Sequence, residues 1–316
     1  MGKEADRLEE LIKKALEKVP KDAVIAVSGG LDSGLLVALL ERYSPSQRLI
    51  NVCLPYGKRY DETNYLDLLV NYLGLDEPIK VILDDREFKE TFEKAVRIIG
   101  RPIPHFNIFP LYVMYKELAK NGVENVILGD GPDETMCGYT RHLIMNYLYK
   151  VLDIEAFGNY MPTIKKVLKP PVAQYLELVG KKPDDLLGKP SVFRGKELVN
   201  TFCRIDMELM RPDMNDMSDK LAGHFGIKNW RPYEDKEVDE FMFNLPVNWK
   251  IDPSGEYGKY LLRKVAEKYL PKEIVWRKHK VGGPLVPVNR LMGWEGTEGE
   301  FGKKKYLEWQ ERILNA

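Results

Sequence analysis

Residues 23–33 read Ala-Val-Ile-Ala-Val-Ser-Gly-Gly-Leu-Asp-Ser, and this stretch decides the fold. Its first five residues are all apolar, which is typical of a strand buried on both faces of a parallel sheet. A loop with two glycines follows, and the Leu-rich segment 34–43 then predicts a helix. A strand, a glycine loop and a helix in this order can bind an anion, because N–H groups at the helix start point toward the ligand.

The alternation of strand and helix patterns continues on both sides of this stretch. Strands are expected at 49–54, 79–83 and 125–128, and helices at 8–16, 61–73, 88–99 and 111–119. Beyond about residue 140, apolar positions at helical spacing dominate. We therefore expect an α/β fold, with a doubly wound parallel sheet in residues 1–145 and a mostly helical part in residues 146–316 that completes the site. Ligands of such sheets bind at the carboxyl ends of the strands.

The first loop, residues 28–33, has the side chains of a phosphate site. Ser28 and Ser33 supply hydroxyl donors, and Gly29 and Gly30 allow close backbone approach. Asp32 would repel a phosphate unless a cation lay between them, so it predicts a magnesium ligand. The alternative is an ordinary turn with a helix-capping Ser or Asp. Neither the Gly-Lys-Ser/Thr ending of a Walker A loop nor a G-x-G-x-x-G pattern is present.

The second loop, residues 129–134, reads Gly-Asp-Gly-Pro-Asp-Glu and follows the strand expected at 125–128. Three acids in five positions are unfavourable without a cation or a basic partner. Both loops follow strands, so both should lie at the same edge of the sheet. Asp32 and Asp133 are therefore predicted to hold one Mg²⁺, the alternative being a solvated acidic turn.

Residues 28–33 resemble the S-G-G-x-D-S signature of the PP-loop ATP pyrophosphatases, and residues 129–139 resemble the second signature of the asparagine synthetase family. Segments 219–235, 259–263 and 270–280 are similar in order and spacing to that family's Asp-Arg … Pro-Phe-Leu-Asp, Lys-x-x-Leu-Arg and Leu-Pro … Trp-Arg-x-Lys segments. The chain thus resembles the synthetase domain of that family over most of its length. The resemblance implies a fold like that of the adenine nucleotide alpha hydrolases.

The resemblance also implies a reaction and its residues. ATP would adenylate a carboxylate, with aspartate the first candidate, and free ammonia or another amine would then form the amide. Lys280, or Lys278 in another register, would stabilise the α-phosphoryl transition state, and Asp130 would orient or deprotonate the amine. The residues implied to bind ATP are Val27, Ser28, Gly29, Gly30, Leu31, Asp32, Ser33, Val52, Gly129 and Asp133.

Departures from the family pattern leave the substrate open. Lys228 and Trp230 stand where the family has Glu and Arg, and an Ala-Gly pair at 222–223 replaces Ser-Met. The alternatives are a β-lactam-type or natural-product amide synthetase acting on another acid, or a tRNA-modifying PP-loop enzyme. The chain starts with a predicted helix and has no early Cys, so we expect no glutaminase domain and a separate glutaminase as a possible partner.

The amino-acid composition limits which binding partners and which cellular compartment are expected. Lys plus Arg and Asp plus Glu both number 48, so no net charge favours nucleic acid or a membrane surface, and no apolar run is long enough to span a bilayer. The three cysteines, Cys53, Cys137 and Cys203, lie far apart in the sequence, which favours a reducing cytoplasm. The four histidines lack metal-binding spacing to one another and are expected to be structural or superficial. The sequence indicates neither the oligomeric state nor the role of residues 160–196.

Overall fold

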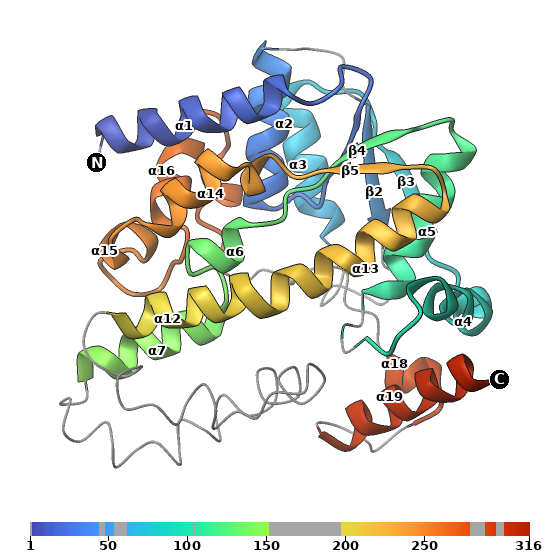
Figure 1. The fold of residues 1–316 in the computed structure, drawn as a ribbon. Coiled ribbons are helices and arrows are strands. Elements are labelled where there is room, and N and C mark those ends of the chain that lie inside the picture. Colours follow the sequence, from blue (N-terminus) through green and yellow to red (C-terminus); the bar gives the residue numbers. More distant parts are fainter. Residues whose placement is uncertain are drawn as a thin grey trace.

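The computed structural model describes residues 2–43, 48–53, 62–103, 105, 107–151, 197–278, 288–294 and 300–316 (Figure 1). Within these residues the centre of the molecule is a sheet of five parallel strands in the order β3-β2-β1-β4-β5. The strands are β1 (Val24–Ala26), β2 (Leu49–Cys53), β3 (Ile79–Ile82), β4 (Asn125–Ile127) and β5 (Lys228–Trp230).

Helices surround the sheet and account for most of the second half of the described chain. They are α1 (Gly2–Glu17), α2 (Leu31–Tyr43), α3 (Thr63–Leu73), α4 (Phe88–Ile99), α5 (Ile108–Lys120), α6 (Pro132–Thr135), α7 (Thr140–Val151), α12 (Glu197–Ile205), α13 (Arg211–His224), α14 (Lys236–Phe243), α15 (Val247–Lys250), α16 (Tyr260–Ala266), α17 (Lys272–Val275), α18 (Val288–Leu291) and α19 (Glu300–Asn315). Short 3₁₀ turns η1 (Asp85–Glu87) and η5 (Pro232–Glu234) and the π-helical turn η4 (Asp206–Met210) complete the described elements.

Each strand at the centre of the sheet contributes to two separate cores. Ile25 and Ile127 pack with α1, α2, α3, α14 and α16, whereas Val24 and Val126 pack with α4, α5, α13 and α19. All four side chains are fully buried. Because neighbouring residues of a strand point to opposite faces, an all-apolar run is what a strand covered on both sides requires. The two groups of helices lie on different sides of the strands in Figure 1.

The parallel sheet and the α/β class are confirmed, and all four predicted strands are present. The fifth strand, β5, was not predicted, and it comes from the part of the chain expected to be helical. It pairs with β4 through the register Val126 with Asn229. Helix α2 begins at Leu31, so the last three residues of the first loop form its first turn.

Candidate active site

The first loop connects β1 to α2 and is closed by its own hydroxyl groups. The Ser28 N–H donates to Ser33 Oγ over 3.2 Å, and the Gly30 N–H donates to Ser28 Oγ over 3.3 Å. Gly29 has φ +72°, and a Cβ there would lie 2.4 Å from the backbone nitrogen of Leu66 in α3. Only glycine fits this position, because an added side chain would be strained and would also clash with backbone.

Lys259 joins the two loops at the carboxyl edge of the sheet. Its Nζ lies 2.6 Å from Asp32 Oδ2 and 2.7 Å from Asp133 Oδ1. The Lys259 side chain is only 4% exposed, so this is a buried ion pair with two carboxylates. The sequence analysis placed Asp32 and Asp133 at one cation, and the structure brings them together at one positive charge. Asp32 lies in the first turn of α2 and Asp133 in α6.

Two glycines allow this close packing. A Cβ on Gly138 would lie 2.0 Å from Asp133 Oδ1 and 2.3 Å from Lys259 Cε. A Cβ on Gly258 would lie 1.9 Å from the carbonyl oxygen of Cys137. Lys259 itself has φ +57°, and its N–H donates to the carbonyl of Met136 over 2.7 Å. The backbone of the second loop therefore fixes the place of the ammonium.

The donor set suits a magnesium ion. Two carboxylates from different loops meet at one cation, and an oxygen-only set of this kind is what Mg²⁺ selects when phosphates complete its coordination. In the structure described here, the Lys259 ammonium contacts both of these carboxylates.

Glu134 lies beside this pair without joining it. Burial and then the neighbouring Asp133 raise the pKa of Glu134 to about 8, and the Tyr139 hydroxyl donates to Glu134 Oε1. The partly buried ring of Tyr139 lies against Arg141, whose guanidinium carbon lies 3.9 Å from the ring centroid. The Gly-Tyr pair that ends the second signature therefore has a packing role for both residues.

Asp130 differs from Asp133 in its exposure to solvent and in its ion-pair partner. Its side chain is half exposed, and its Oδ2 lies 3.7 Å from Arg231 Nε. Arg231 is nearly buried and also pairs with Asp219 at 2.8 Å. Burial and then Asp130 raise the pKa of Glu234 to about 7, and Glu234 accepts a 2.6 Å hydrogen bond from Asn215. Asp130 is thus half exposed to solvent and lies beside Arg231, a residue that was not among the predicted site residues.

Two lysines are predicted for catalysis. Lys280 lies outside the described residues. Lys278 is exposed and pairs with Glu256 at 2.9 Å. Arg277, just before it, pairs with Glu62 and lies over the ring of Tyr65, 3.8 Å from the centroid. This contact attaches the segment to α3.

The residues expected around adenine lie where expected along the sheet. Val27 directly follows β1, Val52 lies in β2 and Gly129 follows β4, and these three strands are neighbours. A Cβ on Gly129 would lie 3.1 Å from the Ser33 nitrogen, so the two loops touch through this glycine. Their contact with adenine remains a prediction.

Three functional candidates were missed by sequence analysis. Lys259 belongs to the quoted Lys-x-x-Leu-Arg segment, and Arg231 directly follows Trp230, where the family pattern has Arg. The sequence therefore held a signal for both. Tyr233, whose hydroxyl donates to the Asp32 carbonyl over 2.9 Å, lies in the quoted segment 219–235, so the sequence held a signal for it as well.

The structure brings two of the three distant cysteines into contact. Cys137 and Cys203 are fully buried free thiols with their sulfur atoms 3.5 Å apart, and His142 lies beside them. The sequence separation of the cysteines concealed this cluster.

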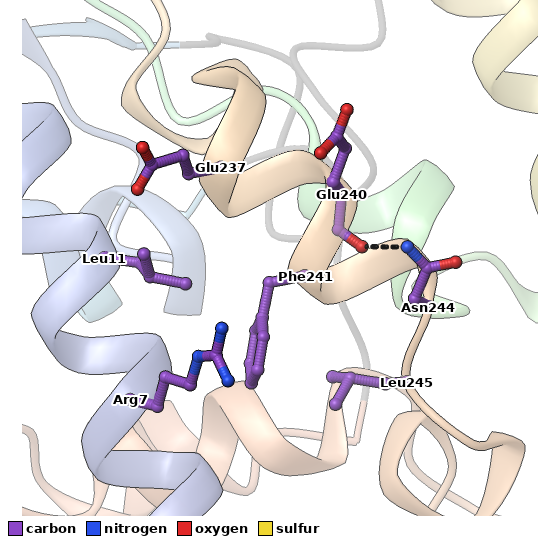
Figure 2. A pocket seen from close by; sticks show the side chains of 7 residues that line it. All are labelled: Arg7, Leu11, Glu237, Glu240, Phe241, Asn244 and Leu245. Carbon is purple, nitrogen blue, oxygen red and sulfur yellow. Dashed lines mark hydrogen bonds between the residues drawn. The ribbon is translucent and has the colours of Figure 1, made fainter.

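A surface pocket lies elsewhere on the molecule, between α1 and α14 (Figure 2). There the guanidinium of Arg7 lies over the ring of Phe241, 5.3 Å from its centroid. Its lining residues are Arg7, Leu11, Glu237, Glu240, Phe241, Asn244 and Leu245. None of the predicted site residues is among them, so this pocket plays no part in the site. Among the described residues, no helix is long and apolar enough to cross a membrane.

The sequence of this chain is similar to those of known proteins. The Asparagine synthase family model matches residues 5–298. The glutamine-hydrolyzing asparagine synthetase 1 of Bacillus subtilis is 24% identical over 335 residues, covering 91% of this chain and 48% of that protein. A provisionally named glutamine-hydrolyzing asparagine synthetase 2 of Methanocaldococcus jannaschii is 30% identical over 143 residues, covering 44% of this chain and 27% of that protein.

A shorter similarity involves the NH(3)-dependent NAD(+) synthetase of Thermoplasma acidophilum. It is 39% identical over 74 residues, covering 23% of this chain and 30% of that protein. The chain therefore spans about half or less of the length of these relatives.

Proposed function

The chain belongs to the asparagine synthase family, and from that premise we propose that it is an ATP-dependent amide-forming ligase that releases AMP and pyrophosphate. Aspartate is the proposed acid and ammonia the proposed amine. The single observation that carries the proposal is the meeting of Asp32 and Asp133 at one buried cation, directly beside the glycine loop. A phosphate loop and two carboxylates are what a magnesium–pyrophosphate group needs at one place.

The proposed reaction has two steps. First, an oxygen of the substrate carboxylate attacks the α-phosphorus of ATP, the bond to the bridging oxygen breaks, and pyrophosphate leaves. Then the amine nitrogen attacks the acyl carbon, loses a proton and expels AMP. In this proposal the N–H groups and hydroxyls of residues 28–33 hold the departing pyrophosphate. Asp32 and Asp133 hold Mg²⁺, which when bound spreads the negative charge of the phosphates.

Two further residues take roles near the reacting atoms. We assign stabilisation of the α-phosphoryl transition state to Lys280, with Lys278 as the competing candidate. We assign orientation or deprotonation of the amine to Asp130, and the half-exposed position of its carboxylate in the second loop supports this. Val27, Val52 and Gly129 are proposed to line the adenine pocket, since they lie in or just after three neighbouring strands.

The source of the amine is a separate matter. The Thermoplasma relative carries NH(3)-dependent in its name, which supports free ammonia. The Bacillus relative carries glutamine-hydrolyzing in its name, which supports ammonia delivered by a glutaminase, and a separate glutaminase is the partner we propose for that case. We further propose a doubly wound PP-loop fold for residues 1–145, a helical part for residues 146–316, and a cytoplasmic location.

Isotope exchange between ATP and pyrophosphate tests the proposal directly. Purified protein is incubated with ATP, Mg²⁺, labelled pyrophosphate and one candidate acid at a time. We expect exchange with aspartate, and asparagine with AMP once ammonium is added. Exchange with another acid alone would reject aspartate while keeping the ligase. If none of the acids supports exchange and the protein binds tRNA specifically, a tRNA-modifying activity would replace the proposal.

Variants then separate the roles. Asp133→Ala should still bind ATP in calorimetry but release no pyrophosphate, whereas Glu90→Ala, an exposed acid in α4, should behave as wild type. Pyrophosphate release at the wild-type rate by Asp133→Ala would reject its role. Lys280→Ala and Lys278→Ala, compared at saturating ATP, identify the catalytic lysine as the one whose loss lowers kcat more.

A further inference from the structure

The cluster of Cys137, His142 and Cys203 lies outside the machinery of the proposed reaction. The two sulfur atoms and a ring nitrogen of His142 lie within 4.8 Å of one another, and all three side chains are fully buried. Cys137 follows α6, His142 lies in α7 and Cys203 in α12, so three separate elements meet here. We propose that these three residues form a binding site for one zinc ion, or a similar thiophilic divalent ion.

The spacing of the sulfur atoms suits a metal. Zinc binds thiolate at about 2.3 Å in tetrahedral geometry, which places two such sulfur atoms about 3.8 Å apart. The observed separation of 3.5 Å between Cys137 Sγ and Cys203 Sγ is within a few tenths of an ångström of that value. A disulfide would need the two atoms at about 2.05 Å, a much larger movement in a close-packed interior.

His142 provides an independent observation. Its Nε2 lies 2.8 Å from Asp206 Oδ2, and Asp206 is also buried and pairs with Arg141 at 2.6 Å. Because a carboxylate accepts hydrogen bonds, Nε2 carries the proton and Nδ1 keeps its lone pair. Among the described residues, the buried Nδ1 has no hydrogen-bond partner. A carboxylate that orients the far nitrogen of a histidine is the usual arrangement behind a metal-binding imidazole.

The charge of such a centre matches its surroundings. Two thiolates neutralise a divalent ion, so the occupied site adds no net charge next to the buried Lys250. The ammonium of Lys250 donates to the side-chain oxygen of Asn200 and to the carbonyl of Phe243, which are both neutral acceptors. Water or another donor would complete the four ligands of the metal.

The site would hold the second loop in place. Cys137 has φ +61°, a conformation that is strained for a side chain of its kind. The next residue, Gly138, donates to the Asp133 carbonyl over 2.9 Å. A metal bound to Cys137 would therefore fix the backbone that positions Asp133, without touching the reacting atoms.

Metal analysis of the full-length chain tests the proposal. Protein purified under argon without chelator should contain about one zinc per chain, and stripped protein titrated with Co²⁺ should show thiolate-to-cobalt charge-transfer bands. These bands distinguish the site from Asp32 and Asp133, whose oxygens cannot produce them. Wild-type thiols should also react faster with a disulfide reagent after chelation. These measurements need no variant.

Variants sharpen the test. Cys137→Ser, Cys203→Ser and His142→Ala should each weaken Co²⁺ binding by at least about 10-fold, while Cys53→Ser, which removes the cysteine outside the cluster, should leave it unchanged. Variants are compared only where circular dichroism shows native helix content. Absence of both zinc and the cobalt bands in wild type would overturn the proposal. So would bands that persist in Cys137→Ser, or an oxidised cysteine pair in the mass spectrum of the native protein.

Discussion

Replacing Lys259 with methionine removes a positive charge that contacts both loop carboxylates, while nearly keeping the side-chain volume. At an effective dielectric constant of 20, each pair at about 2.7 Å contributes roughly 6 kcal/mol of attraction. The desolvation of three buried charges offsets most of this, and removal of one partner from a buried ion pair costs about 3–5 kcal/mol in measured cases. We expect Lys259→Met to lower the free energy of unfolding by that amount in chelator, measured by urea denaturation.

Magnesium should reverse part of the loss. In Lys259→Met the ammonium no longer competes with Mg²⁺ for Asp32 and Asp133. A Mg²⁺ concentration of about 100 times its Kd should then raise the free energy of unfolding by about 2.7 kcal/mol. The matched control is Lys94→Met. Lys94 makes a contact of the same 2.6 Å with Glu90, but both side chains are exposed, so its loss should cost under about 1 kcal/mol and show no extra response to Mg²⁺. Equal unfolding curves for the two variants, with and without Mg²⁺, would refute the reasoning.

Three further predictions concern single positions. Gly29→Ala should lower the free energy of unfolding by about 3 kcal/mol or more, because its Cβ would clash with the backbone of α3. The control is Gly100→Ala, with a similar φ of +78° but open space around it, which should cost only about 1 kcal/mol. Chemical denaturation measures both variants, and equal losses of stability would contradict the clash. Burial raises the pKa of Glu234 to about 7 in the folded chain, so its favourable contribution is present below about pH 4.5 and is lost as pH rises toward 7. Unfolding at pH 5 and pH 8 should therefore show Glu234→Gln gaining about 2 kcal/mol over wild type at the higher pH, and parallel pH curves would exclude this. Tyr233→Phe leaves the Asp32 carbonyl without its 2.9 Å hydrogen bond in a fully buried place and should cost about 1–2 kcal/mol in thermal or urea unfolding; an unchanged value would mean that another donor replaces the hydroxyl.

The sequence was most informative where local pattern and fold agree. The apolar run at 23–27 predicted a strand covered on both faces, and the Leu-rich segment after the glycine loop predicted helix α2, although α2 begins three residues earlier, at Leu31. The meeting of Asp32 and Asp133 was predictable because parallel strands bring their carboxyl ends to one edge. These inferences needed only periodicity, glycine chemistry and the geometry of parallel sheets.

Other features depend on tertiary contacts that a local pattern does not encode. Strand β5 reads Lys-Asn-Trp, with no alternation and no apolar run, and it is a strand because β4 offers it hydrogen-bond partners. Lys259 reaches Asp32 from 227 residues away, through space left by Gly138 and Gly258. Cys137 and Cys203 meet across 66 residues because α7 and α12 pack together. In each case the partner of the side chain or strand is distant in the sequence and comes close only in the folded structure.

The pairing of β4 with β5 has a consequence for the order of folding. Loop closure between strands about a hundred residues apart is slow compared with helix formation, so β5 is expected to join the sheet late. During synthesis, β4 therefore leaves the ribosome with one edge of unpaired N–H and C=O groups, which another chain can capture. The segment that follows α13 supplies β5, whose pairing with β4 satisfies this edge. Residues on both sides of α13 therefore contribute strands to the same sheet.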